Sequence, residues 1–400
     1  MISTFPHSKP HSPTWQPFRA PSHASLRRQN HRVPADLLTR RELNRATLER
    51  QLLLRRSDLP VLDAVEHLVG LQAQEPQDPY TALWSRLDGF RPEELSNLLE
   101  RREVVRSALM RSTIHLVSGE DCLLLRPLMQ PVLDAELARY RDLRGVDVDA
   151  VLAFGRKWLE ERPLNGTELR AALAERFPGH DAADLAYACR NLIPLVQVPP
   201  RGLWKRSGQV RTTPAESWLG RPVVAGPSLG DVVLRYFAVF GPAAVADVAA
   251  WSRLTGLREV VERLRPRLRS FRDERGRELF DLPDALRPDP ETPAPVRFLP
   301  EYDNVLLSFA DRGRFLSVQR RTPLSAVEGR IMGTVLHDGF LFGVWQLQRD
   351  RESGTATVLV SHVERLTRRA EQSVGVEGRR FLRFVADDAS SHDLRFVALA

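Results

Sequence analysis

The fold is decided by Pro194-Leu-Val-Gln-Val198, Pro199-Pro-Arg-Gly202 and Leu203-Trp-Lys-Arg-Ser207. Two apolar segments on either side of a Pro/Gly turn predict a strand, a tight turn and a second strand. The apolar spacing of the preceding residues predicts three helices, at residues 148–159, 166–176 and 181–192. Three helices followed by a β-hairpin form the plan of a winged helix, which is a relative of the helix-turn-helix.

The same plan recurs in the chain. One copy is predicted from helices at residues 231–240, 243–252 and 257–268, with strands at residues 269–272 and 277–280. A less regular copy has helices at residues 39–56, 57–69, 80–87 and 92–101, then strands at residues 104–109 and 113–117. The repeat predicts winged-helix motifs at residues 38–145, which carry a Gln-x-Gln motif, and at residues 146–225 and 226–282.

The last part of the chain has a different pattern. A proline-rich segment at residues 283–295 predicts a linker. It is followed by predicted strands at residues 296–299, 331–336, 340–348 and 356–361, a helix at residues 364–385 and a strand at residues 394–398. We therefore expect an α+β protein whose residues 296–400 form a β-rich domain, as a small barrel or curled sheet with one covering helix.

Composition excludes several classes of protein. With 42% hydrophobic and 27% charged residues among 400, the chain is not collagen, a disulfide scaffold or a mostly disordered protein. No uncharged apolar run approaches the roughly 18–20 residues of a membrane helix. Only two cysteines are present, which fits a reducing cytoplasm.

The charge balance favours a polyanionic partner. The net charge is +7, and 55 of the 58 cationic residues are Arg. A GC-rich genome explains much of the Arg bias, yet Arg also binds phosphate in a bidentate manner and stacks on bases. The Arg preference favours a bacterial source. Charge alone therefore gives nucleic acid only a modest advantage over other partners.

The N-terminal segment has no pattern that predicts a core. Residues 1–34 contain six prolines, four histidines and five basic residues, with no acidic residue. We predict a disordered basic tail over residues 1–37, without the apolar run of a secretory signal. An organelle transit peptide, or a start codon placed too far upstream, would have the same composition.

Familiar catalytic motifs are not found in the sequence. There is no P-loop, no G-x-G-x-x-G after a strand, no H-E-x-x-H and no G-x-S-x-G. The carboxylates lack the spacing of metal ligands. We therefore predict that the protein uses no metal and no cofactor.

Gln72-Ala73-Gln74 is the candidate site, directly after the predicted helix that ends at Gly70. If the segment is extended, both amides lie on one face. A carboxamide is a weak base, but it can position water where the leaving group departs readily, as an alkylated cationic purine does. Without further information, a structural role for two Gln residues after a helix is the more common case.

Three stretches of the chain together resemble a known family. They are Val69-Gly-Leu-Gln-Ala-Gln74, Arg111-Ser-Thr-Ile-His-Leu-Val117, and Leu299-Pro-Glu-Tyr-Asp-Asn-Val-Leu-Leu307 with Ala310-Asp-Arg312. In this order they are similar to the AlkZ/YcaQ-type DNA glycosylases, over about residue 38 to the end. The resemblance implies a C-shaped arrangement of tandem winged helices with a C-terminal β-barrel, around duplex DNA.

The resemblance also implies an activity. It is monofunctional excision of N-alkylated purines, in which the catalytic pair maps onto Gln72 and Gln74. Gln rather than Asp at position 74 resembles the branch that handles bulky alkylating antibiotics and their crosslinks, often for self-resistance.

Other side chains are weaker candidates. Arg111 and His115 are candidates for contact with DNA. The alternative for Arg111 is a solvated surface position, and the alternative for His115 is a purely structural role. Tyr302, Asp303 and Asn304 are candidates for positions near the site, and the alternative is that they form a turn or cap a helix. Arg201, Lys205 and Arg206, beside the middle hairpin, are candidates for contact with the DNA backbone.

We therefore expect a monomeric bacterial cytoplasmic DNA glycosylase whose partner is double-stranded DNA containing alkylated purines, and no membrane. N7-alkylguanine is the favoured base. No Lys lies near the Gln pair in the sequence, which disfavours a Schiff-base lyase step. The alternatives are a winged-helix transcription regulator and a relative that binds damaged DNA without cutting. The sequence does not decide which adduct is the substrate, whether crosslinks are unhooked or whether the base is flipped. It also leaves open whether the role is housekeeping repair or antibiotic resistance.

Overall fold

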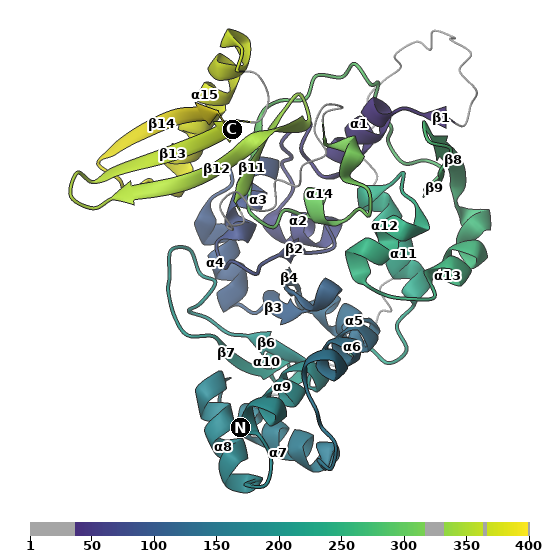
Figure 1. Ribbon diagram of the computed structural model, residues 1–400, viewed down its shortest axis with the longest axis vertical. Helices are drawn as coiled ribbons and strands as arrows, with labels where there is room; N and C mark the ends of the chain where they lie inside the picture. The colour runs from purple at the N-terminus through teal and green to yellow at the C-terminus, as the bar shows by residue number, and fades with distance from the viewer. Residues whose placement is uncertain (1–36, 317–331, 363–365, 399–400) are drawn as a thin grey trace, which may run out of the picture. The chain divides into compact units, whose positions relative to one another are not determined.

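The first described helix begins at a capping box. The Thr39 hydroxyl accepts a hydrogen bond from Glu42 N at the start of α1 (Arg40–Arg50), and the Glu42 carboxylate accepts one from Thr39 N at 2.7 Å. This computed structural model describes residues 37–316, 332–362 and 366–398 (Figure 1). The tail predicted at residues 1–37 therefore lies outside the described residues, apart from Leu37.

The first segment contains the predicted helices and strands, with shifted ends. Its elements after α1 are α2 (Val61–His67), β2 (Leu71–Gln72), α3 (Asp78–Arg86), α4 (Pro92–Glu100), β3 (Val104–Ala108), β4 (Ile114–Ser118), α5 (Gly119–Leu128) and α6 (Gln130–Tyr140). A 3-10 turn (Met110–Ser112) joins β3 to β4, and β1 (Leu37–Leu38) precedes α1. The short β2 and the helices α5 and α6 were not among the predicted elements.

The middle segment departs from the predicted hairpin. Its elements are α7 (Val148–Glu161), β5 (Leu164–Asn165), α8 (Gly166–Arg176), α9 (Ala182–Leu192), β6 (Leu195–Gln197), β7 (Arg211–Pro214) and α10 (Ala215–Leu219). The predicted second strand at residues 203–207 is wrong, because β7 is the strand that pairs with β6.

Residues 203–207 do not form the predicted strand because this part of the chain contacts α3 and α4. The Tyr80 hydroxyl donates to Gly202 O at 2.8 Å, and Trp204 N donates to Ser96 Oγ at 3.1 Å. The Trp204 ring also packs against Tyr80, with centroids 4.9 Å apart. These residues are therefore held by α3 and α4, and the strand resumes only at Arg211.

The remaining elements follow the predicted order, apart from the short helix α14, which was not predicted. They are α11 (Leu229–Phe240), α12 (Val245–Ser252), α13 (Leu257–Leu264), β8 (Arg269–Asp273), β9 (Glu278–Asp281), β10 (Arg297–Leu299), α14 (Asn304–Leu307), β11 (Gly333–His337), β12 (Phe340–Asp350), β13 (Thr355–His362), α15 (Arg368–Val385) and β14 (Ser391–Ala398). Further 3-10 turns lie at Arg265–Arg267 and Arg312–Arg314. The winged-helix arrangement and the C-shape stay predictions.

The C-terminal sheet is open, so of its two expected forms, a small barrel or a curled sheet, the barrel is wrong. Its strand order is β10-β11-β12-β13-β14, and β14 joins β13 in parallel after α15. This crossover places β10 and β14 at opposite edges of the described sheet. The apolar face is covered by α15, where Phe381 stacks on Phe298 with centroids 5.2 Å apart (Figure 1). A sheet whose apolar face is covered by a helix has no need to close on itself.

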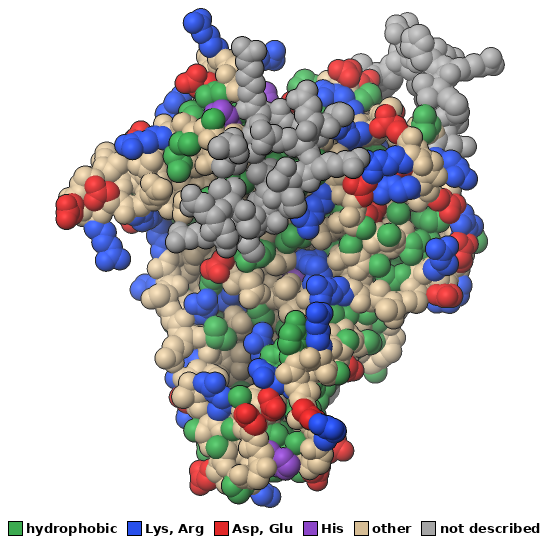
Figure 2. Space-filling view, viewed as in Figure 1, with side chains coloured by type: hydrophobic (Ala, Val, Ile, Leu, Met, Phe, Trp, Pro, Cys, Tyr) green, Lys and Arg blue, Asp and Glu red, His purple; other side chains and the backbone are tan. Residues whose placement is uncertain are grey.

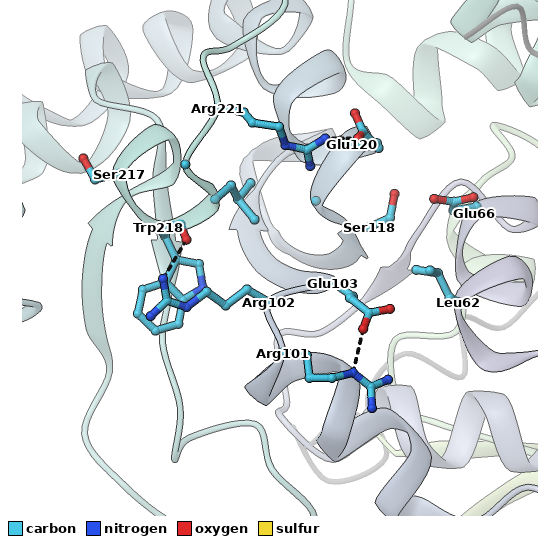
Figure 3. A pocket seen from close by; sticks show the side chains of 13 residues that line it. Leu62, Glu66, Arg101, Arg102, Glu103, Ser118, Glu120, Ser217, Trp218 and Arg221 are labelled. Carbon is cyan, nitrogen blue, oxygen red and sulfur yellow. Dashed lines mark hydrogen bonds and ion pairs between the residues drawn. The ribbon is translucent and has the colours of Figure 1, made fainter. Parts of the chain in front are cut away.

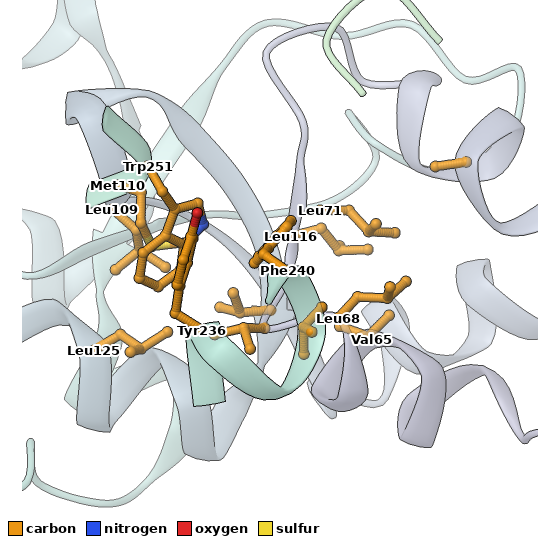
Figure 4. Packing of buried hydrophobic residues seen from close by; sticks show 14 of the residues in the cluster. Val65, Leu68, Leu71, Leu109, Met110, Leu116, Leu125, Tyr236, Phe240 and Trp251 are labelled. Atoms are coloured by element: carbon orange, nitrogen blue, oxygen red, sulfur yellow. The ribbon is translucent and has the colours of Figure 1, made fainter. Parts of the chain in front are cut away.

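One sheet joins the first two predicted segments. Its order is β2-β4-β3-β6-β7-β5, and β3 pairs with β6 through Arg106 opposite Gln197 and Ser107 opposite Val196. The hydrophobic core is also shared by distant segments. Tyr236 and Phe240 of α11 and Trp251 of α12 pack near Leu109 and Met110, which precede β4 (Figure 4). The Tyr236 and Trp251 ring centroids are 5.2 Å apart.

A buried ion pair ties the segment after β10 to α3. Arg86 donates two hydrogen bonds to the Asp303 carboxylate, each at 2.8 Å, and the two side chains are 0% and 1% exposed. Asp303 Oδ1 also caps α14 by accepting from Val305 N. No helix of the described residues is long and apolar enough to span a membrane.

Replacing Asp303 by Asn is expected to destabilise the fold. It leaves the Arg86 cation buried without a counterion, which costs about 3–5 kcal/mol. Urea unfolding measures the loss. The matched control is Asp184→Asn, which breaks the half-exposed pair with Arg141 and is expected to cost under about 1 kcal/mol. Equal losses in the two variants would contradict a structural role for the Arg86–Asp303 pair.

Candidate DNA-processing site

The chain turns from α2 into β2 at a position that requires glycine. Gly70 has φ +87°, and a Cβ there would lie 2.5 Å from Val117 Cγ1 and 3.0 Å from Leu116 O. Asn304 Nδ2 donates to Gly70 O at 2.7 Å. Gly70, two residues before Gln72, therefore lies close against β4 and is hydrogen-bonded to Asn304 of α14.

The Gln-x-Gln motif lies along β4. Leu71 pairs with Leu116 and Gln72 with His115, and Ala73 N donates to Ile114 O at 2.8 Å. Leu71 and Ala73 are 2% and 0% exposed, in the core. Gln72 is 6% exposed, whereas Gln74 is exposed to solvent and its Oε1 accepts from Ile114 N at 3.3 Å.

Arg111 reaches Gln72 from the turn before β4. Its backbone is left-handed, with φ 58° and ψ 18°, and Ser112 follows with φ 57°. Nη2 donates to Gln72 Oε1 at 2.5 Å and lies 3.4 Å from His115 Nε2, while Nη1 donates to Trp251 O at 2.7 Å. The structure therefore brings three of the candidate residues, Gln72, Arg111 and His115, together.

His115 is neutral in this setting. It is 1% exposed, and burial together with the Arg111 charge lowers its pKa to about 3. Nδ1 lies 3.0 Å from Thr113 O. Because a carbonyl can only accept, Nδ1 carries the proton and Nε2 is left as an acceptor facing Arg111.

Two further arginines lie near Arg111, and neither was predicted as a site residue from the sequence. Burial, followed by the charges of Arg253 and Arg312, lowers the pKa of Arg111 to about 10. Arg253 caps α12 two residues after Trp251, and Ala310 N, two residues before Arg312, donates to Asp247 Oδ1 of α12 at 2.9 Å. Arg253 and Arg312 are exposed. Their shared position came from tertiary packing, which no sequence spacing reveals.

Arg106 lies behind the motif and was also missed. It is 2% exposed, and Nη2 donates to Ala73 O at 2.8 Å. Burial and the charge of Arg201 lower its pKa to about 10. The residues around Arg106 in β3 are buried on both faces of the strand, and nothing in their pattern indicates that Arg106 contacts the motif.

Carboxyl groups lie beside the motif. Asp78 at the start of α3 is 8% exposed, and burial together with the charges of Glu301 and Glu75 raises its pKa well above the usual range. Burial, with the charge of Glu75, also raises the pKa of Glu301. Burial and the neighbouring carboxylates therefore both disfavour the charged form of these carboxyl groups, and a nearby cation would favour it.

The remaining candidates have partners within the protein. Asp303 and Asn304 are buried and bind Arg86 and Gly70 O, as described above, and Tyr302 is partly buried. Lys205 forms ion pairs with Asp387 and Asp388. Arg201 Nη1 donates to Gly208 O at 3.3 Å, and Arg206 is exposed. Direct contact of these residues with DNA stays a prediction.

A cavity of about 480 Å³ lies at the other end of β4. Ser118 and Glu103 line it, together with Arg102, whose guanidinium stacks on Trp218 at 4.0 Å (Figure 3). It contains none of the candidate residues. Among the described residues, no group of three or more His, Cys, Asp or Glu side chains is arranged to hold a metal ion.

Comparisons with known proteins agree with the resemblance seen in the sequence. The model of the AlkZ-like DNA glycosylase family matches residues 65–384. The structure of the Streptomyces sahachiroi DNA glycosylase AlkZ is similar, with a TM-score of 0.70 and 20% sequence identity, over 90% of this chain and 100% of that chain. The comparison with curated proteins gave no match.

The structural likeness shows a shared fold, and the family match includes the Gln pair, Arg111, His115 and the segment after β10. That match favours an enzyme over a transcription regulator. Since it covers most of the sequence, the chain belongs to the AlkZ-like DNA glycosylase family, whose members act on DNA.

Proposed function

We propose that this enzyme hydrolyses the N-glycosidic bond of alkylated purines in double-stranded DNA, with N7-alkylguanine as the favoured base. Gln72 and Gln74 lie at the reacting nucleotide, and water attacks C1′ as the C1′–N9 bond breaks. The bonding electron pair enters the cationic purine, which leaves neutral, and the water proton passes to solvent. The product is an abasic site.

The observation that carries this proposal is the chemistry around Gln72. Its neighbours are Arg111, a cation, and His115, whose pKa is lowered to about 3. Neither is a general base near neutral pH. Neutral amides suffice only where the leaving group needs little help, as a cationic purine does.

Two further observations support a cationic base in DNA. The carboxyls of Asp78 and Glu301 have raised pKa values and would ionise more readily beside a positive charge. Arg253 and Arg312 offer exposed guanidinium groups beside Arg111 for the phosphates. Arg and Lys side chains also run down the middle of the face drawn in Figure 2. We propose further that the enzyme acts as a monomer in the bacterial cytoplasm.

A lysine-dependent lyase step is not part of the proposal. Lys157 and Lys205 are the lysines in the described residues, and Lys205 is bound by Asp387 and Asp388. We propose that the reaction ends at the abasic site. Bulky N7 adducts and interstrand crosslinks are further candidate substrates for the same chemistry.

Alanine at either Gln is expected to slow excision. We expect Gln72→Ala or Gln74→Ala to lose about 10²-fold or more in single-turnover excision of N7-methylguanine, equal to about 2.7 kcal/mol of barrier. Alkali cleavage reveals the abasic sites. Gln372→Ala, on the exposed face of α15, is the matched control. No excision by the wild type of N7-methylguanine or of bulky N7 adducts would overturn the proposed function.

Removing Arg253 or Arg312 is expected to weaken DNA binding without altering base preference. Each lost phosphate contact reduces the slope of log K against log salt by about 0.9. Fluorescence anisotropy with unmodified duplex at several salt concentrations measures the slope. Arg351→Ala, in the exposed turn between β12 and β13, is the control. Slopes unchanged in Arg253→Ala and Arg312→Ala would exclude these phosphate contacts.

The excision rate is expected not to follow a histidine titration. His115 has a pKa of about 3, so it stays neutral down to mildly acidic pH and loses its acceptor role only near pH 3. Single-turnover rates between about pH 5.5 and 8 test this. A rate change with an apparent pKa of about 6.5, abolished in His115→Asn, would contradict a permanently neutral His115.

A further inference from the structure

The amide orientation of Gln72 is set by the chemistry of its partner. A guanidinium group can only donate hydrogen bonds, so the Gln72 atom that faces Arg111 Nη2 at 2.5 Å is the carbonyl oxygen. The NH₂ group of Gln72 is therefore the part left for other partners. A charge-assisted bond to the oxygen also polarises the amide and makes its N–H a stronger donor.

Arg111 is itself held in place by two more acceptors. Trp251 O accepts from Nη1 at 2.7 Å, and the unprotonated Nε2 of His115 lies 3.4 Å from Nη2. All three acceptors, including Gln72 Oε1, are neutral. Arg111 therefore keeps its charge without a carboxylate partner, and its left-handed backbone sends the side chain back along β4.

Gln74 differs in both respects. Its Oε1 accepts a longer bond of 3.3 Å from the uncharged Ile114 N–H, and the residue is exposed. A carbonyl oxygen has two lone pairs, so this amide still has an acceptor for a water proton. The two amides are thus not equivalent, because the Gln72 carbonyl is bound by the Arg111 cation and the Gln74 carbonyl belongs to an exposed side chain.

We propose that Gln72 acts as a hydrogen-bond donor to the departing purine, and that Arg111 is the positioning residue that fixes this orientation. This inference rests on the proposed function. As the C1′–N9 bond breaks, its electron pair moves into the purine, so a ring nitrogen or the exocyclic oxygen becomes a better acceptor. A donor placed there stabilises the transition state more than the bound substrate. Gln74 remains to hold the attacking water.

The first test separates donor from acceptor. Gln72→Glu keeps the size and the oxygen that Arg111 contacts, but it removes the NH₂ donor. We expect the unfolding temperature of Gln72→Glu to equal or exceed that of the wild type, because Arg111 gains an anionic partner. Excision of N7-methylguanine by this variant should fall about 10²-fold. Gln372→Glu is the matched control. Excision by Gln72→Glu within about threefold of wild type would overturn the donor role.

The second test asks whether Arg111 acts through Gln72. Lys cannot reproduce the forked contacts of Arg, so we expect Arg111→Lys to slow excision about tenfold in the wild-type background but less than about twofold in Gln72→Ala. The salt slope of DNA binding should stay unchanged. Arg126→Lys controls for losing a buried Arg, since Arg126 is 1% exposed and binds Asn191 O at 2.6 Å. Additive losses, or a slope reduced by about 0.9, would show a direct phosphate contact instead.

These results are distinguishable from failure of the proposed function. If the wild type excises no N7 adduct, the proposed function fails. The unfolding temperatures still test the Arg111–Gln72 contact, because Gln72→Ala should unfold below Gln72→Glu. If the wild type is active and Gln72→Glu is also fully active, only the donor role fails.

Discussion

The pairing of β2 with β4 is the constraint on which the candidate site depends. It places Gln72 opposite His115, and the left-handed turn before β4 brings Arg111 onto the same side. Gly70 permits the close approach to Val117 that this pairing requires. A side chain at position 70, or a different register, would separate Gln72 from Arg111 and leave the partly buried guanidinium without one of its three acceptors.

The charges around the motif are divided between two kinds of group. Arg106 is a buried cation and Arg111 is a partly buried one, and their hydrogen-bond partners are neutral carbonyl and amide oxygens. No carboxylate among the described residues forms an ion pair with either of them. Asp78 and Glu301 belong to a region where burial favours the uncharged carboxyl. Burial of unpaired charge is costly in general. Such groups are common at functional sites because a ligand of opposite charge offsets the cost.

Local sequence signals predicted most of the secondary structure. The capping box at Thr39 and the apolar spacing of α8 and α11 act over a few residues and need no tertiary context. Prediction failed where long-range packing decides. The segment at 203–207 binds α3 and α4 instead of pairing with β6, and the C-terminal sheet is open rather than closed into the small barrel that was one of its two expected forms.

The candidate pair itself was visible in the sequence, since Gln72 and Gln74 follow a helix end and belong to motifs in a family order. Local patterns in the chain predicted most of the helices and strands and singled out these two amides. The folded structure was needed to show that Arg111 contacts Gln72, that His115 is neutral, and that Arg253 and Arg312 lie near them. Those relations join residues far apart in the chain, and their physical basis is burial and hydrogen-bond geometry, which no local pattern encodes.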